Sequence, residues 1–165
     1  MLEEIKTRRS IRRFREDSVD DHTIRTIVEM GTWAPSGLNN QPWRFVVVRS
    51  PEVRKRLAGQ TKYGSTIESA PVCIAVFLSQ PESYERVKDV QAIGACIQNM
   101  LLTIHHLGLG GVWLGEILKN RGRVEEILGV PEGCELMAVI AFGWPATAGG
   151  PGVRRPLGEV VLGWK

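Results

Sequence analysis

The stretch Val90-Gln-Ala-Ile-Gly-Ala-Cys-Ile-Gln-Asn-Met-Leu-Leu-Thr-Ile104 contains no charged residue. Its large apolar residues recur at the spacing of one helix face, and small residues lie on another face, where a second helix can approach closely. We therefore predict one long helix from about Lys88 to Leu107, ended by Gly108. The uncharged run is shorter than the ~20 residues of a membrane span. A helix apolar nearly all round is a central core helix, and we expect it also to meet a second subunit.

Shorter elements surround this helix. Three apolar runs predict buried strands at residues 44–49, 72–78 and 136–143, the first by its near-continuous apolar character buried on both faces. A short strand is expected at 110–114, and a last strand at 160–164 would be able to reach over a partner chain. Helical spacing and capping residues predict further helices at 2–6, 20–31, 51–59, 63–69 and 120–128.

The bulk composition is that of one globular domain. The chain has 165 residues, of which 43% are hydrophobic and 24% are charged. The N-terminus shows no apolar signal core, so we expect a cytoplasmic protein. Cys73, Cys96 and Cys134 are far apart among apolar neighbours, which favours buried, reduced thiols. They lack zinc-site spacing and the chain has only three His, so we predict no metal.

Positive charge is concentrated in one segment, Lys6–Arg15, where six of ten residues are basic and none is acidic. The chain has 21 Lys+Arg and 18 Asp+Glu, so the other residues hold 21 − 6 = 15 bases against 18 acids. Such a cluster suits nucleic acid, an anionic membrane or the phosphate of a small cofactor. Ser10 as a hydroxyl donor, with Ile11 and Phe14 as apolar anchors, favours the small phosphate. If this segment is helical or turn-like, Arg8 and Arg12 share a face.

Two further segments suggest binding. Residues 33–43, Trp-Ala-Pro-Ser-Gly-Leu-Asn-Asn-Gln-Pro-Trp, combine two prolines with three side-chain amides, which predicts either a ligand-binding loop or a well-packed turn. Gly108-Leu-Gly-Gly-Val-Trp-Leu-Gly115 follows a helix and matches neither nucleotide-loop fingerprint. We interpret it instead as a strand whose bare backbone comes close to a ligand.

In order along nearly the whole chain, these segments resemble the FMN-dependent nitroreductase family. The resemblance is carried by Arg8-Arg-Ser-Ile-Arg12, Ala34-Pro-Ser-Gly-Leu-Asn-Asn-Gln-Pro-Trp43, the helix leading into Leu107–Gly115, and Arg154-Arg155-Pro156. It implies an α+β fold with a mostly antiparallel mixed sheet between helices. It also implies a homodimer whose long central helix lies at the interface, with FMN in each of two interface clefts.

The resemblance assigns roles to individual residues. Arg8, Arg9, Ser10 and Arg12 match contacts to the phosphate and ribityl chain, where guanidinium groups suit phosphate oxygens. Residues of the amide-rich loop match the segment that the other subunit lays against the isoalloxazine; these are Pro35, Ser36, Gly37 and Asn39. Leu114 and Gly115 match the backbone that faces flavin N5. Arg154, or Arg155 in the neighbouring register, would return to the phosphate.

The implied activity is an FMN oxidoreductase with a ping-pong mechanism. NADH or NADPH would give hydride to flavin N5, and a nitroaromatic, quinone or similar electron-poor acceptor would then take it. No protein side chain is expected to be catalytic. Larger relatives carry a helical insertion as a substrate lid, and the connection from Gln80 to Lys88 is too short for one, so substrate preference does not carry over.

Two other functions are compatible with the residues. The first keeps the fold and FMN but changes the chemistry, for example to dehalogenation, flavin fragmentation or azoline oxidation. The second is a nucleic-acid-binding module that uses residues 6–15, which the net acidity of the remaining chain disfavours. We expect His105 and His106 to be structural and Glu116 to be a solvated carboxylate at a helix start. We expect Trp113 either to pack in the core or the dimer contact, or to form a platform against which a substrate stacks.

Overall fold

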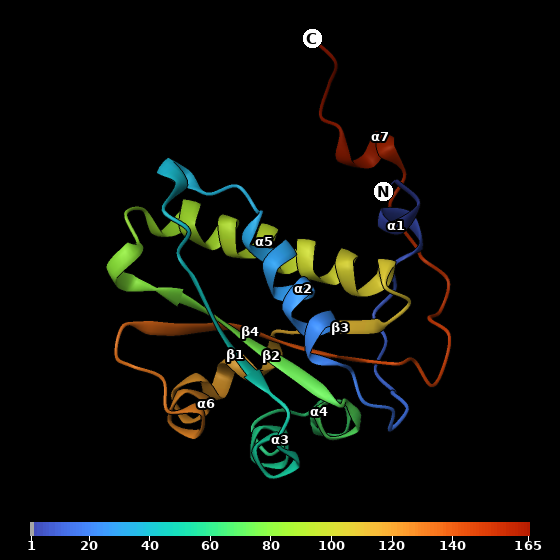
Figure 1. Ribbon diagram of the computed structural model, residues 1–165. Coiled ribbons are helices and arrows are strands. Elements are labelled where there is room, and N and C mark those ends of the chain that lie inside the picture. The colour runs from blue at the N-terminus through green and yellow to red at the C-terminus, as the bar shows by residue number, and fades with distance from the viewer. Residues whose placement is uncertain (1) are drawn as a thin grey trace.

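A computed structural model describes residues 2–165, which form one four-stranded sheet between two layers of helices (Figure 1). The strands are β1 (Trp43–Val48), β2 (Val72–Ser79), β3 (Gly110–Leu114) and β4 (Cys134–Gly143). Their order across the sheet is β1-β2-β4-β3, and every pair is antiparallel. The α+β class and these four strands confirm the prediction from the sequence.

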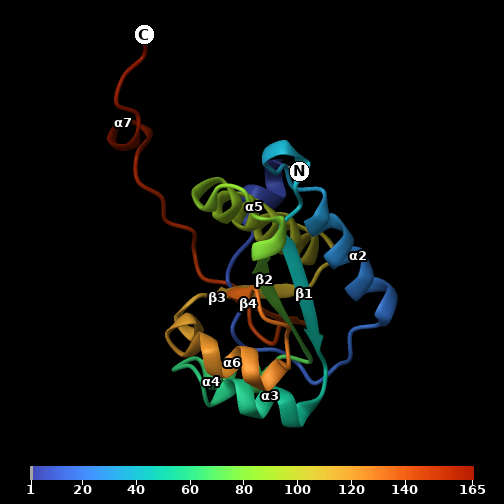
Figure 2. The ribbon, with the colours of Figure 1, turned by 90° about the vertical axis from the view of Figure 1, so that its left-hand side faces the viewer.

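Helices cover both faces of the sheet. Helices α2 and α5 lie on one face, and α3, α4 and α6 lie on the other (Figure 2). The helices are α1 (Leu2–Thr7), α2 (Asp21–Thr32), α3 (Pro51–Ala58), α4 (Gly64–Ser69), α5 (Arg86–His106), α6 (Arg121–Leu128) and α7 (Leu157–Val160). Three short 3-10 turns join them, η1 (Gly37–Asn39), η2 (Gln80–Glu82) and η3 (Glu116–Asn120).

The central strand β2 divides the core into two. All eight of its residues are buried. Because successive side chains of a strand point to opposite faces, Ile74 and Val76 pack under α5, whereas Cys73, Ala75 and Phe77 pack against the opposite helices. The near-continuous apolar run that predicted this strand therefore reflects burial on both faces.

Helix α5 is the long helix that the uncharged run predicts. It begins at Arg86, two residues earlier than expected, because the side chain of Glu85 accepts hydrogen bonds from the backbone N–H groups of Val87 and Lys88 at 3.2 and 2.9 Å. It ends before Gly108, whose φ of 76° belongs to the left-handed region that glycine favours. Among residues 2–165, no helix is both long and apolar enough to cross a membrane.

Two expectations about strands were wrong. Strand β1 is not buried on both faces, because it lies at a sheet edge, and Val47 is 41% exposed. Residues 160–164 do not form a strand. The chain after residue 152 leaves the body, forms the single turn α7, and continues as an extended tail (Figures 1 and 2). Leu162 and Trp164 on this tail are exposed, so the single chain offers the tail no apolar surface.

Candidate functional site

The basic segment leaves helix α1 at Thr7 and is not helical beyond it. Ser10 forms a parallel bridge with Gly111, and the backbone N–H of Ile11 donates to the carbonyl of Gly111 at 3.0 Å. The segment thus runs beside the outer edge of β3. The shared face of Arg8 and Arg12 was expected for a helical or turn-like segment, and no helix continues past Thr7 here.

Arg8 is a half-buried cation without a counter-ion. Among residues 2–165, no side chain or carbonyl forms a hydrogen bond or ion pair with its guanidinium. Burial lowers the pKa of Arg8, and the positive charges of Arg154 and Arg9 lower it further. Three guanidinium groups therefore gather where the described chain supplies no anion. This arrangement is stabilised when an anionic ligand binds among them.

Unlike Arg8, Arg9 forms hydrogen bonds to backbone carbonyl groups through its guanidinium. Its Nε donates to the carbonyl of Gly150 at 3.1 Å, and its Nη1 donates to the carbonyls of Lys6 and Arg8 at 2.7 and 2.8 Å. A Cβ on Gly152 would overlap the Arg9 guanidinium. Arg9 therefore clamps the end of α1 to the chain that follows β4, and most of its donors already have partners.

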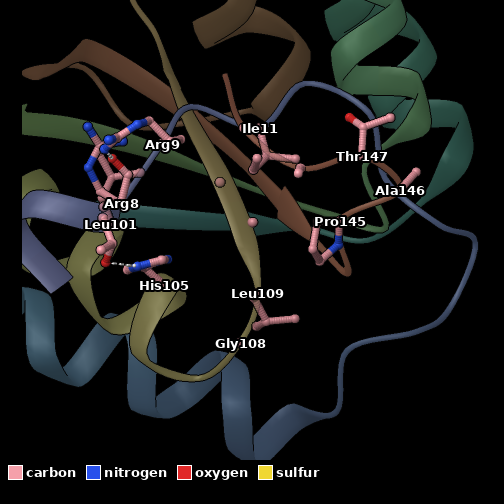
Figure 3. A pocket seen from close by; sticks show the side chains of 15 residues that line it. Arg8, Arg9, Ile11, Leu101, His105, Gly108, Leu109, Pro145, Ala146 and Thr147 are labelled. Atoms are coloured by element: carbon pink, nitrogen blue, oxygen red, sulfur yellow. Dashed lines mark hydrogen bonds between the residues drawn. The ribbon is translucent and has the colours of Figure 1, made fainter. Parts of the chain in front are cut away.

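A hollow of about 410 Å³ opens beside this segment (Figure 3). It is bounded by the end of α1, the last turn of α5, the start of β3 and the loop after β4. His105 lies at its edge, where its Nε2 is 2.9 Å from the Thr7 hydroxyl. The lining residues are Thr7, Arg8, Arg9, Ile11, Leu101, His105, Gly108, Leu109, Gly110, Gly111 and residues 145–149.

The amide-rich loop is held in an unusual backbone conformation. Leu38, Asn39 and Gln41 have φ angles of 54°, 55° and 48°. This left-handed region costs a non-glycine residue about 1–2 kcal/mol. The Ser36 hydroxyl accepts a hydrogen bond from the backbone N–H of Gln41 at 3.0 Å, which closes the loop. Such strain is found where a loop is shaped for binding, which favours the ligand-binding interpretation over a mere turn.

Three candidates of this loop lie around the strained residues. Pro35 is exposed, and Ser36 and Gly37 are half-buried. Gly37 is required by close packing, because a Cβ there would overlap the hydroxyl of Tyr84. Leu38, next to it, is exposed, so the tip of the loop presents an apolar side chain outward.

The end of β3 exposes two groups that a ligand could contact, the main chain at Gly115 and the indole of Trp113. The side chain of Leu114 is 2% exposed and belongs to the core under α3, α4 and α6. Gly115 faces open space, so only main-chain atoms of this pair are available to a ligand. Trp113 points to the opposite face, is 43% exposed, and lies over Gly94 of α5, where an added Cβ would come within 3.9 Å of the ring.

Glu116 is not a solvated carboxylate, contrary to expectation. Its Oε2 accepts hydrogen bonds from the Thr61 hydroxyl at 2.6 Å and the Lys62 backbone N–H at 3.0 Å, and its Oε1 pairs with Lys119 at 2.5 Å. The pKa of Glu116 is lowered to about 2, first by Lys119 and then by Thr61. This carboxylate ties the segment after Gly115 to the loop before α4. Nothing in the local sequence indicated a partner 55 residues away.

The C-terminal arginines differ in their placement. Arg154 lies near enough to Arg8 to lower its pKa, and it shares a hollow of about 270 Å³ with Ile5, Lys6, Arg9 and Gly152. Arg155 has no hydrogen bond or ion pair with any of residues 2–165. The structure therefore brings Arg154, rather than Arg155, to the cluster around Arg8.

The two halves of the candidate site lie far apart in one chain. The amide-rich loop contacts the first turn of α5, where Asn40 reaches Asp89 at 2.7 Å, whereas α1 contacts the last turn through His105. These ends of α5 are separated by about 24 Å, at 1.5 Å per residue (Figure 1). The loop also precedes β1, and Gly115 follows β3, so they lie at opposite edges of the sheet.

Comparison with known proteins gives consistent matches over the whole chain. A model of the nitroreductase family matches residues 5–62 and 58–144. A Methanothermobacter thermautotrophicus protein assigned as an NADH dehydrogenase/NAD(P)H nitroreductase is 37% identical over 159 residues, covering 93% of this chain and 81% of that protein. A protein of Desulfovibrio desulfuricans, assigned as a nitroreductase and crystallised with FMN, superposes with a TM-score of 0.94 at 46% identity, covering 99% of this chain and 96% of that one. The NADPH:FMN oxidoreductase of Vibrio harveyi, solved with NAD+, gives a TM-score of 0.90 at 26% identity, covering 99% and 76%.

Proposed function

This chain belongs to the nitroreductase family, and from that premise we propose that it is a single-domain oxidoreductase that binds FMN and draws electrons from NADH or NADPH. FMN bound between the Arg8 cluster and the backbone at the end of β3 would supply the hydride chemistry at its N5 atom. Hydride would pass from the nicotinamide to the flavin and then, in a second half-reaction, to a nitroaromatic, quinone or similar electron-poor acceptor. A reducing compartment such as the cytoplasm suits the three free thiols.

The uncompensated charge of Arg8 carries this proposal. A phosphate monoester is a dianion near neutral pH, and it would neutralise the cluster that Arg8 forms with Arg154. Arg12 and Ser10 belong to the same basic segment and would add a guanidinium and a hydroxyl donor. Arg9 would act indirectly, because its hydrogen bonds hold the backbone that presents Arg8.

The backbone at the end of β3 would meet the redox end of the cofactor. Leu114 keeps its side chain in the core, and Gly115 has none, so a planar ring can approach the main chain closely. Glu116 fixes this segment against Thr61 and Lys62, which holds the backbone N–H groups in one position. We expect these residues to orient the ring system, while no side chain supplies the reacting atoms.

We also propose that the protein works as a homodimer. The loop with Pro35, Ser36, Gly37 and Asn39 lies about 24 Å along α5 from the Arg8 end, too far for both to enclose one ligand in a single chain. A second copy placed in the opposite direction along α5 would bring its loop to that end. The half-buried Gly94 and Ala95 of α5, the exposed Trp33 and the apolar loop tip would lie in such an interface.

The proposal is tested by visible absorbance. The purified protein, or the apoprotein after addition of FMN, is expected to show the near-ultraviolet and visible absorption bands of an oxidised flavin. Under anaerobic conditions, NADH or NADPH should bleach the long-wavelength band, and a quinone should restore it. A protein that acquires no flavin spectrum on titration with FMN would refute the assignment. Bound FMN that neither nicotinamide bleaches would indicate one of the alternative flavin chemistries.

A further inference from the structure

One buried carboxylate joins the amide-rich loop to the central helix. Asp89 lies in the first turn of α5 and is 0% exposed. Its Oδ2 accepts hydrogen bonds from the Ser83 hydroxyl at 2.6 Å and from the backbone N–H groups of Tyr84 and Glu85 at 3.1 Å each. Its Oδ1 accepts a hydrogen bond from Asn40 Nδ2 at 2.7 Å. Four donors use the acceptor capacity of the carboxylate.

Asn40 is locked by this contact. Its Nδ2 also donates to the carbonyl of Glu82 at 2.9 Å, so both amide hydrogens face acceptors and the opposite amide orientation is excluded. Its Oδ1 is buried and has no partner among residues 2–165. Burial raises the pKa of Asp89, but hydrogen bonds from Ser83, Asn40 and the backbone outweigh it and the pKa is lowered, which keeps the acceptor ionised.

The locked amide sits inside the strained part of the loop. Asn40 itself is in the right-handed helical region, but Asn39 before it and Gln41 after it have φ angles of 55° and 48°. Such a backbone persists only where surrounding contacts impose it. Asn40 anchors this strained stretch to α5 by its bond to Asp89 and to η2 by its bond to Glu82, whereas the side-chain hydrogen bonds of Asn39 and Gln41 among residues 2–165 stay within the loop.

We propose that Asp89 is a positioning residue, which through Asn40 holds the 36–41 loop in the shape that meets the cofactor of the partner subunit. This inference rests on the proposed FMN function and adds the residues that preorganise one wall of the site. Asp89 touches no ligand itself. Because the loop is remote from the Arg8 of its own chain, the effect of Asp89 crosses the dimer interface.

Three variants separate positioning from a general loss of structure. Asn40→Ala removes the loop's bonds to Asp89 and to the Glu82 carbonyl. Asp89→Asn sets an amide against the Asn40 amide, and Ser83→Ala removes a hydrogen bond to the same carboxylate from outside the loop. We expect the first two to weaken FMN binding about tenfold, as for one lost charge-assisted hydrogen bond, and to alter the visible circular dichroism of bound FMN. Ser83→Ala should bind like wild type. The proposal would be overturned if all three variants weakened FMN binding equally, or if Asn40→Ala bound FMN like wild type. Asn40→Ala keeps the test decisive even if Asp89→Asn does not fold.

Mixed dimers test whether the effect crosses the interface. One dimer carries Arg8→Ala in one subunit and Asn40→Ala in the other, and a second carries both changes in one subunit beside a wild-type partner. If the loop serves the partner's site, the first dimer keeps one FMN site of wild-type affinity and the second keeps none. The reverse pattern would refute action across the interface. Wild-type protein is titrated in parallel, so that a chain that does not bind FMN at all is recognised as failure of the proposed function.

Discussion

Replacing Arg8 with Ala should weaken FMN binding without destabilising the apoprotein. This combination distinguishes a ligand-binding cation from a structural one. The Arg8 guanidinium forms no hydrogen bond or ion pair within residues 2–165, and burial, with the neighbouring charges of Arg154 and Arg9, lowers its pKa. The Ala variant therefore loses no hydrogen bond or ion pair of the folded chain, and it loses some electrostatic repulsion.

The expected magnitude follows from the bond that would be lost. A hydrogen bond to a charged group contributes about 1.5–3 kcal/mol, which corresponds to about a 10- to 150-fold rise in the Kd for FMN. The melting temperature of the apoprotein should stay the same or rise slightly, because removing one of three clustered like charges changes stability by about 1 kcal/mol or less. The Arg8→Ala, Arg12→Ala double variant should lose FMN on purification and remain a folded dimer.

Arg13→Ala is the matched control. It removes the same charge from the same segment, but Arg13 is exposed and is not among the residues that line the hollows around Arg8 and Arg154. Quenching of FMN fluorescence during titration of apoprotein gives the Kd, and thermal unfolding of apoprotein gives the stability. Equal affinity in Arg8→Ala and wild type would refute the phosphate assignment. A clear fall in the apoprotein melting temperature would show that Arg8 is structural.

Two other expectations concern the end of β3. Gly115→Ala should change the free energy of unfolding by no more than about 0.5 kcal/mol, because no atom lies near the added methyl, but it should weaken FMN binding. Gly143→Ala should lower the free energy of unfolding by about 1–3 kcal/mol, because its methyl would overlap the Pro71 ring. Thermal unfolding measures the change in stability, and FMN titration measures the change in binding. Glu116→Gln should lower the melting temperature at pH 7. Because the pKa of Glu116 falls from about 4.3 when unfolded to about 2 when folded, that difference should shrink as pH drops below about 4.3 and vanish near pH 2.

Elements with a strong period could be predicted from the sequence. The uncharged run from Val90 to Ile104 predicted α5 to within two residues at its start, because its helical spacing matches a buried stripe. The apolar run in β2 predicted a buried strand, and β2 is central and buried on both faces. The similar run in β1 predicted the same burial wrongly. Local composition is alike in the two strands, and only the order of strands in the sheet decides which one lies at an edge.

Contacts between distant segments could not be predicted. Asn40 and Asp89 are 49 residues apart, and Glu116 and Thr61 are 55 apart. Asp89 did carry a signal, as the last charged residue before the uncharged run, since a carboxylate in the first helical turn interacts favourably with the helix dipole. The dipole explains an acidic residue there, but not its complete burial. That required the loop to fold back over the helix.

The basic segment shows how the fold gives two residues of one type different partners. Arg8 and Arg9 are adjacent and identical in type, and from the sequence both were matched to contacts with the phosphate and ribityl chain. Both line the hollow beside α1, but the chain after β4 passes close to Arg9. Arg9 then meets the carbonyls of the chain after β4 and becomes a clamp, while Arg8 remains a cation without a counter-ion. Because the chain after β4 lies far from Arg9 in the sequence, no reading of the segment alone could have separated the two roles. A motif that assigns both arginines to one ligand is therefore an assignment of the segment, and the carbonyl groups that the fold brings to Arg9 leave Arg8 as the guanidinium available to a ligand.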